Sequence, residues 1–255
     1  MGTIAEKYAK NNDEKQLLER IYDLAGRVSA RGVYAFSDFL TPAQQALIAK
    51  ATELTRFCDI TFDGGYEGAL RKVAVLRPKD CYYEQEPPIE ILTVKCTWGS
   101  PSNRDYLGAI MALGIKRTVL GDIADSADPP FIVCQSKIAQ YLIDELKSVG
   151  KCTVELERGI VGTLPELKYE NITATVASMR LDCVVAEAFS VSRTVAAGYI
   201  KGEKVSLNYL PENSVSREVK EGDIISVRGF GKAEIAKEGG QSRKGRTFIE
   251  IKRYK

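Results

Sequence analysis

The chain has 255 residues, 44% hydrophobic and 27% charged, as in an ordinary soluble globular protein with room for two or three small domains. It contains no histidine, which excludes every Ser-His or Cys-His nucleophile and lowers the expectation of catalysis. The net charge of +2 is uneven: from Ser178 onward 15 Lys and Arg face 10 Asp and Glu, whereas the preceding residues hold 21 against 24. A basic C-terminal third on a mildly acidic body favours an anionic partner at one end.

The six cysteines are spaced too widely for a metal or redox motif, because no two lie closer than fifteen residues apart. We therefore expect buried thiols in a reducing compartment, with no metal and no cofactor. The first twenty residues are too polar for a signal peptide or a membrane span. These features predict a cytoplasmic protein with no membrane partner, and a monomer, because no exposed apolar heptad is evident.

A first small domain, of mixed helices and strands, is expected over residues 1–82. Apolar spacing predicts a helix over Asp13–Ala30, and Thr41-Pro42 is typical of the start of a second helix, reaching to about Cys58. Val73 to Leu76 resembles a strand that Pro78 ends. Between these, Gly64-Gly65 lacks the Gly-Lys-Ser/Thr of a phosphate-binding loop, so we favour a tight structural turn.

The middle stretch, residues 83–165, shows the order β-α-β-β-α-β, which is the split-βαβ or ferredoxin-like plan shared with RRM domains. The predicted elements are a strand at 90–96, a helix at 104–113, strands at 118–123 and 131–135, a helix at 136–149 and a strand at 152–157. The strand at 131–135 lacks the stacking aromatics of RRM proteins. Asn103, Arg104, Lys116 and Arg117 form a second candidate surface for RNA or a partner, although the residues alone slightly favour ordinary solvated charges at helix ends.

The third region, residues 178–255, begins with two short amphipathic helices. Apolar residues from Leu181 to Phe189 recur at helical spacing, and Ser192 is suited to cap a second helix that Gly202 ends. Arg193 lies in that helix's first turn, where the helix dipole favours anions, so an anionic ligand explains it better than helix stability does. Beyond Gly202, polar residues alternate with apolar ones as in a strand.

This third region resembles an S4 domain, an RNA-binding module. The resemblance rests on Arg180-Leu181-Asp182, Ser192-Arg193, a helix ending in Ile200, Asn208 after the strand, and Gly222-Asp223 before a closing strand. Two positions depart from the family pattern. Glu203 replaces the Val that usually follows the Gly, and Tyr209 replaces the Gly that usually follows the Asn.

The resemblance extends along the chain to the YlmH family of bacterial S4-domain RNA-binding proteins. The residues that carry it are Asn103 to Ala109, Gly114 to Arg117, Gly121 to Ile123 and Phe62 to Gly65. It implies an α+β protein with an N-terminal α/β domain, an RRM-like middle domain and a C-terminal S4 module. It also implies a non-catalytic protein that binds rRNA or tRNA on the large ribosomal subunit during rescue of stalled translation, with a link to cell division.

The expected RNA-binding residues share a polar or basic side chain at the ends of the two helices and the following strands: Arg180, Asp182, Ser192, Arg193, Lys201, Lys204, Asn208, Arg228 and Lys232. Asp182 is also suited simply to brace the arginines. Because few aromatic residues lie near these positions in the sequence, we expect contacts to phosphates and 2′-hydroxyls, rather than base stacking, to supply most of the RNA binding. The basic hairpin tip around Gly239-Gly240, with Arg243, Lys244 and Arg246, is suited to follow phosphates.

Two other interpretations remain open. S4 modules are often attached to RNA-modifying enzymes, but a pseudouridine synthase needs a catalytic Arg-Leu-Asp outside the module, and the chain's one such motif lies inside it. A methyltransferase needs a Gly-rich loop after a strand, which does not occur before Ser178. In the third interpretation the S4-like region is vestigial and the acidic body docks a protein partner, which would show weak salt dependence.

Overall fold

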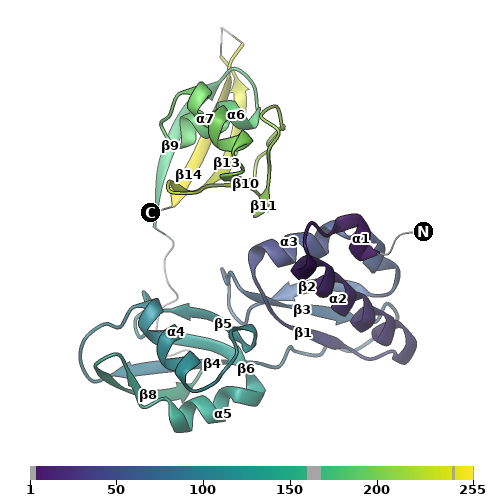
Figure 1. Cartoon of the computed structure of the whole chain (residues 1–255), viewed down its shortest axis with the longest axis vertical. Coiled ribbons are helices and arrows are strands. Elements are labelled where there is room, and N and C mark those ends of the chain that lie inside the picture. Colours follow the sequence, from purple (N-terminus) through teal and green to yellow (C-terminus); the bar gives the residue numbers. More distant parts are fainter. Residues whose placement is uncertain (1–3, 160–167, 243–244, 255) are drawn as a thin grey trace. The chain divides into compact units, whose positions relative to one another are not determined.

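The computed structural model describes residues 4–159, 168–242 and 245–254. The chain divides into two compact units, Met1–Glu166 and Leu167–Lys255 (Figure 1). Helices and antiparallel sheets occur in both units, so the chain is a mixed helix and strand protein. The domain end expected at residue 165, and Arg243 and Lys244 of the hairpin tip, lie outside the described residues.

The first unit begins with a three-stranded antiparallel sheet, ordered β1-β3-β2, and the helices that cover it. The elements are α1 (Ile4–Tyr8), α2 (Asn12–Arg31), β1 (Ala35–Leu40), α3 (Pro42–Lys50), the 3₁₀ helix η1 (Thr52–Arg56), β2 (Asp59–Asp63) and β3 (Lys72–Arg77). Leu18, Ile21, Ala25 and Val28 of α2 recur on one face, and all four are buried in the core beneath the helix. The long helix and β3 confirm the sequence expectations, whereas β1 and β2 were not predicted.

The second expected helix is shorter than predicted. Thr41 caps it through a capping box with Gln44, but α3 ends at Lys50 because Ala51 leaves the helical region with φ −81° and ψ 66°. The chain then continues as η1, where the Thr55 hydroxyl donates to the Thr52 carbonyl at 2.7 Å. The change of backbone at Ala51 therefore separates η1 from α3, and the α-helix does not reach Cys58.

A five-stranded antiparallel sheet, ordered β5-β6-β4-β8-β7, forms the rest of the first unit. Its elements are β4 (Ile89–Cys96), α4 (Asn103–Ala112), the 3₁₀ helix η2 (Arg117–Val119), β5 (Leu120–Ala124), β6 (Phe131–Gln135), α5 (Ser136–Glu145), β7 (Ser148–Val149) and β8 (Cys152–Arg158). The predicted β-α-β-β-α-β order is observed. Helix α5 is four residues shorter than expected, because Leu146 leaves the helical region and Ser148–Val149 pairs with β8.

The two sheets of the first unit share a small apolar core. Phe39 and Val73 from the three-stranded sheet are buried with Phe131 and Val133 from the five-stranded sheet. Gly121 lies at this contact, where an added Cβ would stand 2.9 Å from the Phe39 ring. Only glycine fits there, and the shared core joins the two sheets within one compact unit.

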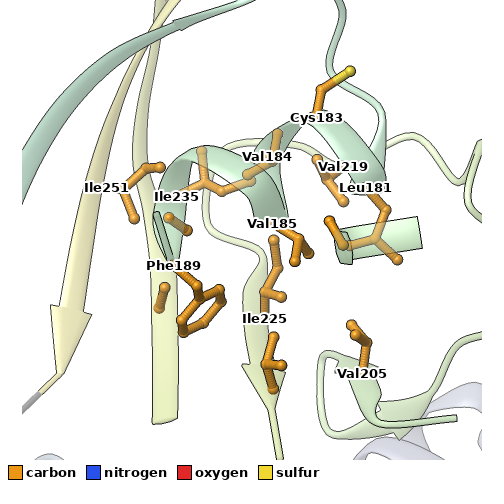
Figure 2. Close-up of a cluster of buried hydrophobic side chains, with 14 of the residues drawn as sticks. Leu181, Cys183, Val184, Val185, Phe189, Val205, Val219, Ile225, Ile235 and Ile251 are labelled. Carbon is orange, nitrogen blue, oxygen red and sulfur yellow. The ribbon is translucent and has the colours of Figure 1, made fainter. Parts of the chain in front are cut away.

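The second unit is a six-stranded antiparallel sheet, ordered β11-β10-β12-β13-β14-β9, with two helices on one face. Its elements are β9 (Tyr169–Val176), α6 (Leu181–Ala188), α7 (Arg193–Lys201), β10 (Val205–Leu207), β11 (Leu210–Pro211), β12 (Ile224–Val227), β13 (Gly231–Gln241) and β14 (Thr247–Tyr254). Leu181, Val184 and Val185 of α6 pack onto Ile225, Ile235 and Ile251 of the sheet (Figure 2). Strand β9 was not predicted, yet it pairs with β14 along its whole length.

Within the described residues, no single helix is both long and apolar enough to cross a membrane. The α6 and α7 helices pass that test together by length and composition, but they are bent by 115° relative to one another.

Candidate nucleic-acid interface

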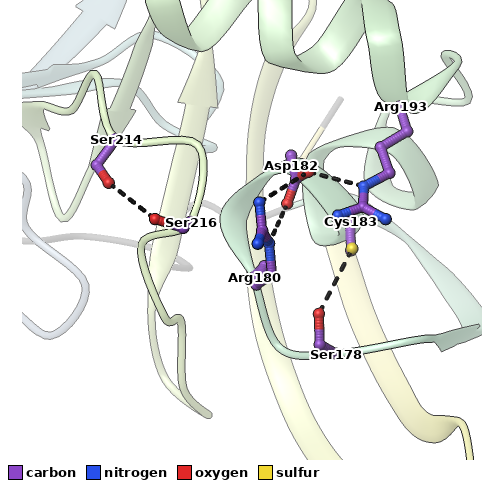
Figure 3. Close-up of polar contacts among 7 residues, drawn as sticks. All are labelled: Ser178, Arg180, Asp182, Cys183, Arg193, Ser214 and Ser216. Carbon is purple, nitrogen blue, oxygen red and sulfur yellow. Dashed lines mark hydrogen bonds and ion pairs between the residues drawn. The ribbon is translucent and has the colours of Figure 1, made fainter.

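Arg180 and Arg193 are brought together by one buried carboxylate. The Asp182 side chain is 6% exposed, and it accepts from Arg180 Nε at 3.0 Å and from Arg193 Nε at 2.7 Å. Figure 3 shows the two guanidinium groups reaching this carboxylate, Arg180 from the residue before α6 and Arg193 from the start of α7. We call Arg180 and Arg193 the arginine pair. Their side chains remain 40% and 54% exposed, so most of their N–H donors face solvent.

The charges of these three residues are mutually stabilised. Burial alone would raise the pKa of Asp182, but the hydrogen bonds from Arg180 and Arg193 outweigh burial and hold that pKa below its ordinary value. The hydrogen bond to Asp182 raises the pKa of Arg193. Asp182 therefore acts through the arginine pair, as a brace that fixes two cations at the start of α6 and α7.

Local sequence places the arginine pair at adjoining helix starts. Arg180 is the N-cap residue of α6, and the following Leu181 N–H donates to the Arg217 carbonyl at 2.8 Å. Ser192 caps α7 as predicted, accepting the Val195 N–H at 3.2 Å. A ligand that binds the arginine pair would therefore also meet the positive end of the α7 dipole.

A second basic group lies at the other end of α7. Lys201, Lys204 and Arg228, which we call the basic turn, are all exposed, and the Arg228 N–H donates to the Lys204 carbonyl at 2.9 Å. At 1.5 Å per residue, Lys201 lies about 12 Å along the helix from Arg193. The four cations Arg180, Arg193, Lys201 and Lys204 therefore divide between the two ends of α7 rather than forming one cluster.

Asn208 has a structural role in the neighbouring turn. Its amide nitrogen donates to Asp223 Oδ1 at 2.8 Å, and its amide oxygen accepts the Ile224 N–H at 2.9 Å. Asn208 and Tyr209 have φ angles of 49° and 66°, as in the two-residue turns that favour Asn-Gly. Tyr209 thus keeps the turn that the family pattern makes with glycine.

Lys232 differs from the other predicted residues. It lies on β13, its neighbour Ala233 points into the core, and its ammonium stands 4.2 Å from the centre of the Tyr254 ring. Burial lowers the pKa of Lys232. Its side chain therefore occupies the sheet face turned away from the helices, so it does not extend the arginine pair.

Aromatic residues do lie beside the basic turn, contrary to the sequence expectation. Phe230 is 43% exposed, and its ring lies 5.3 Å from that of Tyr199. The Lys204 ammonium stands 5.7 Å from the Tyr199 ring centre. Sequence reasoning missed these rings because Tyr199 belongs to α7 and Phe230 follows β12. The sequence did offer one signal for this surface, because Phe230 lies two positions after Arg228.

The second candidate surface, on the first unit, is only partly exposed. Lys116 and Arg104 face solvent, whereas Asn103 donates to the Ile123 carbonyl at 2.8 Å. Arg117 donates to the carbonyls of Leu120 and Gly121 at 2.9 Å, and burial lowers its pKa. Asn103, which is exposed but uncharged, and half-buried Arg117 therefore use side-chain donors to hold the chain.

The Phe62 to Gly65 segment forms a turn that is braced by side chains, not a ligand loop. Gly65 has φ 83°, and its N–H donates to Asp63 Oδ1 at 2.7 Å. An added Cβ at Gly64 would stand 2.3 Å from the Ala69 Cβ. Among the described residues, no group of three or more His, Cys, Asp or Glu is placed to hold a metal ion.

The arginine pair and the basic turn present exposed cations that are suited to bind an anion such as a phosphate, whereas the family model that matches this chain lies in the first unit. Residues 98–161 match the family model described as "Putative RNA-binding domain in YlmH". The whole chain is 29% identical over 261 residues to the ribosome-associated protein quality control protein P2 of Bacillus subtilis (strain 168), with 100% of both chains covered. The resemblance to the YlmH family is therefore confirmed.

One solved structure is also similar, the cell division protein ylmH from Streptococcus pneumoniae. It has a TM-score of 0.48 and 20% sequence identity, and the match covers 59% of this chain and 93% of that chain.

Proposed function

We propose that the protein is a non-catalytic factor that binds structured rRNA or tRNA on the large ribosomal subunit, during rescue or quality control of stalled translation. The arginine pair carries this proposal. Two guanidinium groups fixed by one buried carboxylate, with their remaining donors exposed at a helix start, match the geometry of phosphate oxygens. The ribosomal setting is supported by the name of the B. subtilis relative, which aligns along its full length.

In this proposal the second unit is an S4 module and the β4 to β8 region is an RRM-like domain. The sheet order β5-β6-β4-β8 supports the latter, because it places the first and third strands of a β-α-β-β-α-β unit side by side at the centre. A cytoplasmic monomer belongs to the proposal through the sequence features that predict it, and a link to cell division through the family resemblance.

The RNA would be bound mainly by its backbone. The arginine pair and the basic turn lie about 12 Å apart along α7, so they suit phosphates of a folded RNA rather than one isolated phosphate. A-form helices hide the deep groove from side chains and display phosphates and 2′-hydroxyls. Shape would therefore be read more than sequence, with Phe230 available for an unstacked base beside the basic turn.

Sedimentation of cell lysate at low and high salt tests the proposal. Wild type should travel with the large subunit at low salt and leave it at high salt, and Arg180→Glu/Arg193→Glu should stay at the top of the gradient. Lys237→Gln, an exposed lysine of β13, provides a control outside both basic groups. Wild type that stays at the top at both salt concentrations would contradict the ribosomal part of the proposal.

Purified components separate binding from the ribosomal setting. Affinity for a hairpin RNA should fall with salt with a slope of about −0.9 per neutralised phosphate on a duplex. Folded Arg193→Gln should lose about one unit of that slope, whereas Lys237→Gln should lose less. An unchanged affinity and slope in Arg193→Gln would show that the arginine pair is not the contact. RNA modified after incubation with the protein would instead favour the enzyme interpretation.

A further inference from the structure

A cavity of about 470 Å³ opens beside the arginine pair in the second unit. It lies among the end of β9, helix α6, the loop before α7 and the start of β14, and Arg193 forms part of its wall. Its volume falls within the range of sites that bind small ligands. Of the residues that the sequence predicts to contact RNA, Arg193 and Arg246 line this cavity.

Apolar and charged side chains both line the cavity. Val176, Ala186 and Val191, which we call its floor, supply apolar surface, while Arg193, Arg246 and Glu187, which we call its rim, supply charge. This combination suits a flat ligand with an apolar face and a polar, anionic edge, which describes a nucleotide. A purely apolar occupant would leave the remaining N–H donors of Arg193 and Arg246 unused, and a free phosphate would leave the apolar floor unused.

Arg246 is held in a fixed orientation. Its Nε donates to the Thr175 hydroxyl at 3.1 Å, and a terminal nitrogen donates to the Thr175 carbonyl. The same terminal nitrogen lies 3.8 Å from a Glu187 carboxylate oxygen. Thr175 belongs to β9, so the guanidinium plane is positioned by the strand that sequence reasoning did not find. A fixed guanidinium plane can stack on a base at little further entropic cost.

Glu187 supplies an acceptor at the rim. Its side chain is 42% exposed, and an ionised carboxylate offers two acceptor oxygens and no donor. A base that presents two adjacent N–H groups on its Watson–Crick edge pairs best with such a carboxylate, and guanine has that pattern. Uracil presents one N–H between two carbonyls, which a carboxylate repels. The rim therefore favours guanine over uracil.

We infer that this cavity receives one unpaired nucleotide, preferably guanosine, from an RNA whose backbone is held by the arginine pair. The inference rests on the proposed function, because Arg193 would bind the phosphate next to the extruded base. Arg193 uses Nε for Asp182, so its terminal N–H groups remain to donate to that phosphate. The surface thus reads an RNA stem with a bulged or looped-out base, rather than shape alone.

Short RNA hairpins test this inference directly. One hairpin is fully paired, and four others carry a single bulged G, A, C or U at the same position. With the full-length chain, fluorescence anisotropy at two salt concentrations should show the bulged-G hairpin bound at least about tenfold more tightly than the paired hairpin, since a base held on a protein platform changes affinity by that order. The bulged-U hairpin should bind about as weakly as the paired one.

Two variants assign the effect to the cavity. Ala186→Leu fills the floor without changing charge, and it should reduce binding of the bulged-G hairpin to the level of the paired hairpin. Glu187→Gln preserves size and should remove the preference for G over U. Ala46→Leu, at a half-buried alanine of α3, is the matched control and should leave all five affinities unchanged. Thermal melts establish that each variant is folded.

The outcomes separate the inference from the proposed function. Equal, salt-dependent binding of paired and bulged hairpins, unaffected by Ala186→Leu and Glu187→Gln, overturns the nucleotide cavity and leaves RNA binding intact. Failure to bind any hairpin at low salt overturns RNA binding and the cavity with it.

Discussion

The two units use pairs of arginines in opposite ways. In the first unit, Arg71 and Arg117 are half-buried and donate to backbone carbonyls, and burial lowers the pKa of Arg71 to about 10. In the second unit, Arg180 and Arg193 share a buried carboxylate and stay substantially exposed. Hydrogen bonding to Asp182 raises the pKa of Arg193.

The comparison shows that a cluster of arginines indicates a ligand-binding surface only when the groups that already bind those arginines are known. Arg71 donates to the carbonyls of Leu120, Phe39 and Arg117, so its guanidinium joins three segments of the first unit. The arginine pair in the second unit joins two helix starts and keeps donors for a ligand. We expect the first pair to determine stability and the second pair to determine binding.

Removing Arg71 should have the largest effect on stability. Arg71→Ala leaves the Phe39 and Arg117 carbonyls without their charged donor and removes one of the two arginine donors to the Leu120 carbonyl, and we expect the free energy of unfolding of the first unit to fall by about 3 kcal/mol. Urea denaturation measures this loss. Arg104→Ala, at an exposed arginine of α4, should change stability by less than about 0.5 kcal/mol. Equal losses of stability in the two variants would contradict the proposal that half-buried arginines stabilise the first unit more than exposed ones do.

Asp182→Asn should have a smaller effect on stability but a clear pH signature. The neutral amide no longer pairs with two guanidinium groups, and we expect a loss of about 1–2 kcal/mol near neutral pH. Because the native pKa of Asp182 is depressed, its stabilisation is complete above the unfolded value of about 3.8 and is lost as pH falls through the native pKa.

The free energy of unfolding, measured as the pH is lowered, tests this direction of the pH dependence. Wild type and Asp182→Asn should differ most above pH 4 and should converge as the pH falls further. A difference that grew on acidification would mean that Asp182 is not stabilised as an anion in the native state.

Replacing Arg193 with another cation tests whether RNA binding depends on the guanidinium geometry or on charge alone. Arg193→Lys retains the charge but replaces a planar fork with a point charge, so the salt slope should be kept while affinity for hairpin RNA falls by about three- to tenfold. Salt-dependent anisotropy measures both quantities. Full affinity in Arg193→Lys would show that charge alone, without guanidinium geometry, accounts for binding.

Much of the second unit was predictable from sequence because its signals are local. The apolar spacing of α6 and the Ser192 cap depend on residues within a few positions of each other, and both are confirmed. What was missed depends on distant segments. Strand β9 has only a weak alternating pattern, and its pairing with β14 joins residues more than seventy positions apart.

The same reason explains the errors within the candidate site. Lys232 and Lys204 look alike in sequence, but the pleat of β13 turns Lys232 toward Tyr254 and away from the helices. Asn208 and Arg117 have polar side chains that the sequence cannot distinguish from ligand-binding ones, yet both are occupied by neighbouring backbone or side-chain groups. Arg246 was predicted only as part of a flexible tip, whereas Thr175 fixes it at the cavity rim.

The smallest expected effect concerns the ends of two helices. Helix α2 ends at Gly32 with φ 65°, whereas α7 is followed by Glu203 with φ 54°. A non-glycine residue in this left-handed region is less favourable by about 1 kcal/mol, offset in part by the greater chain entropy of glycine when unfolded. Glu203→Gly should therefore raise the free energy of unfolding of the second unit by about 0.5 kcal/mol, and Gly32→Ala should lower that of the first by about 1 kcal/mol.

Charge must be separated from backbone strain at this position, because Glu203 lies between Lys201 and Lys204. Glu203→Gln removes the carboxylate but keeps the strained side chain, so it should leave stability unchanged within about 0.5 kcal/mol while raising affinity for hairpin RNA slightly. Glu203→Gly should match Glu203→Gln in affinity and exceed it in stability. Equal stabilisation by both substitutions would instead be explained by removal of an unfavourable charge. In that case the left-handed backbone at the end of α7 would not be a source of strain.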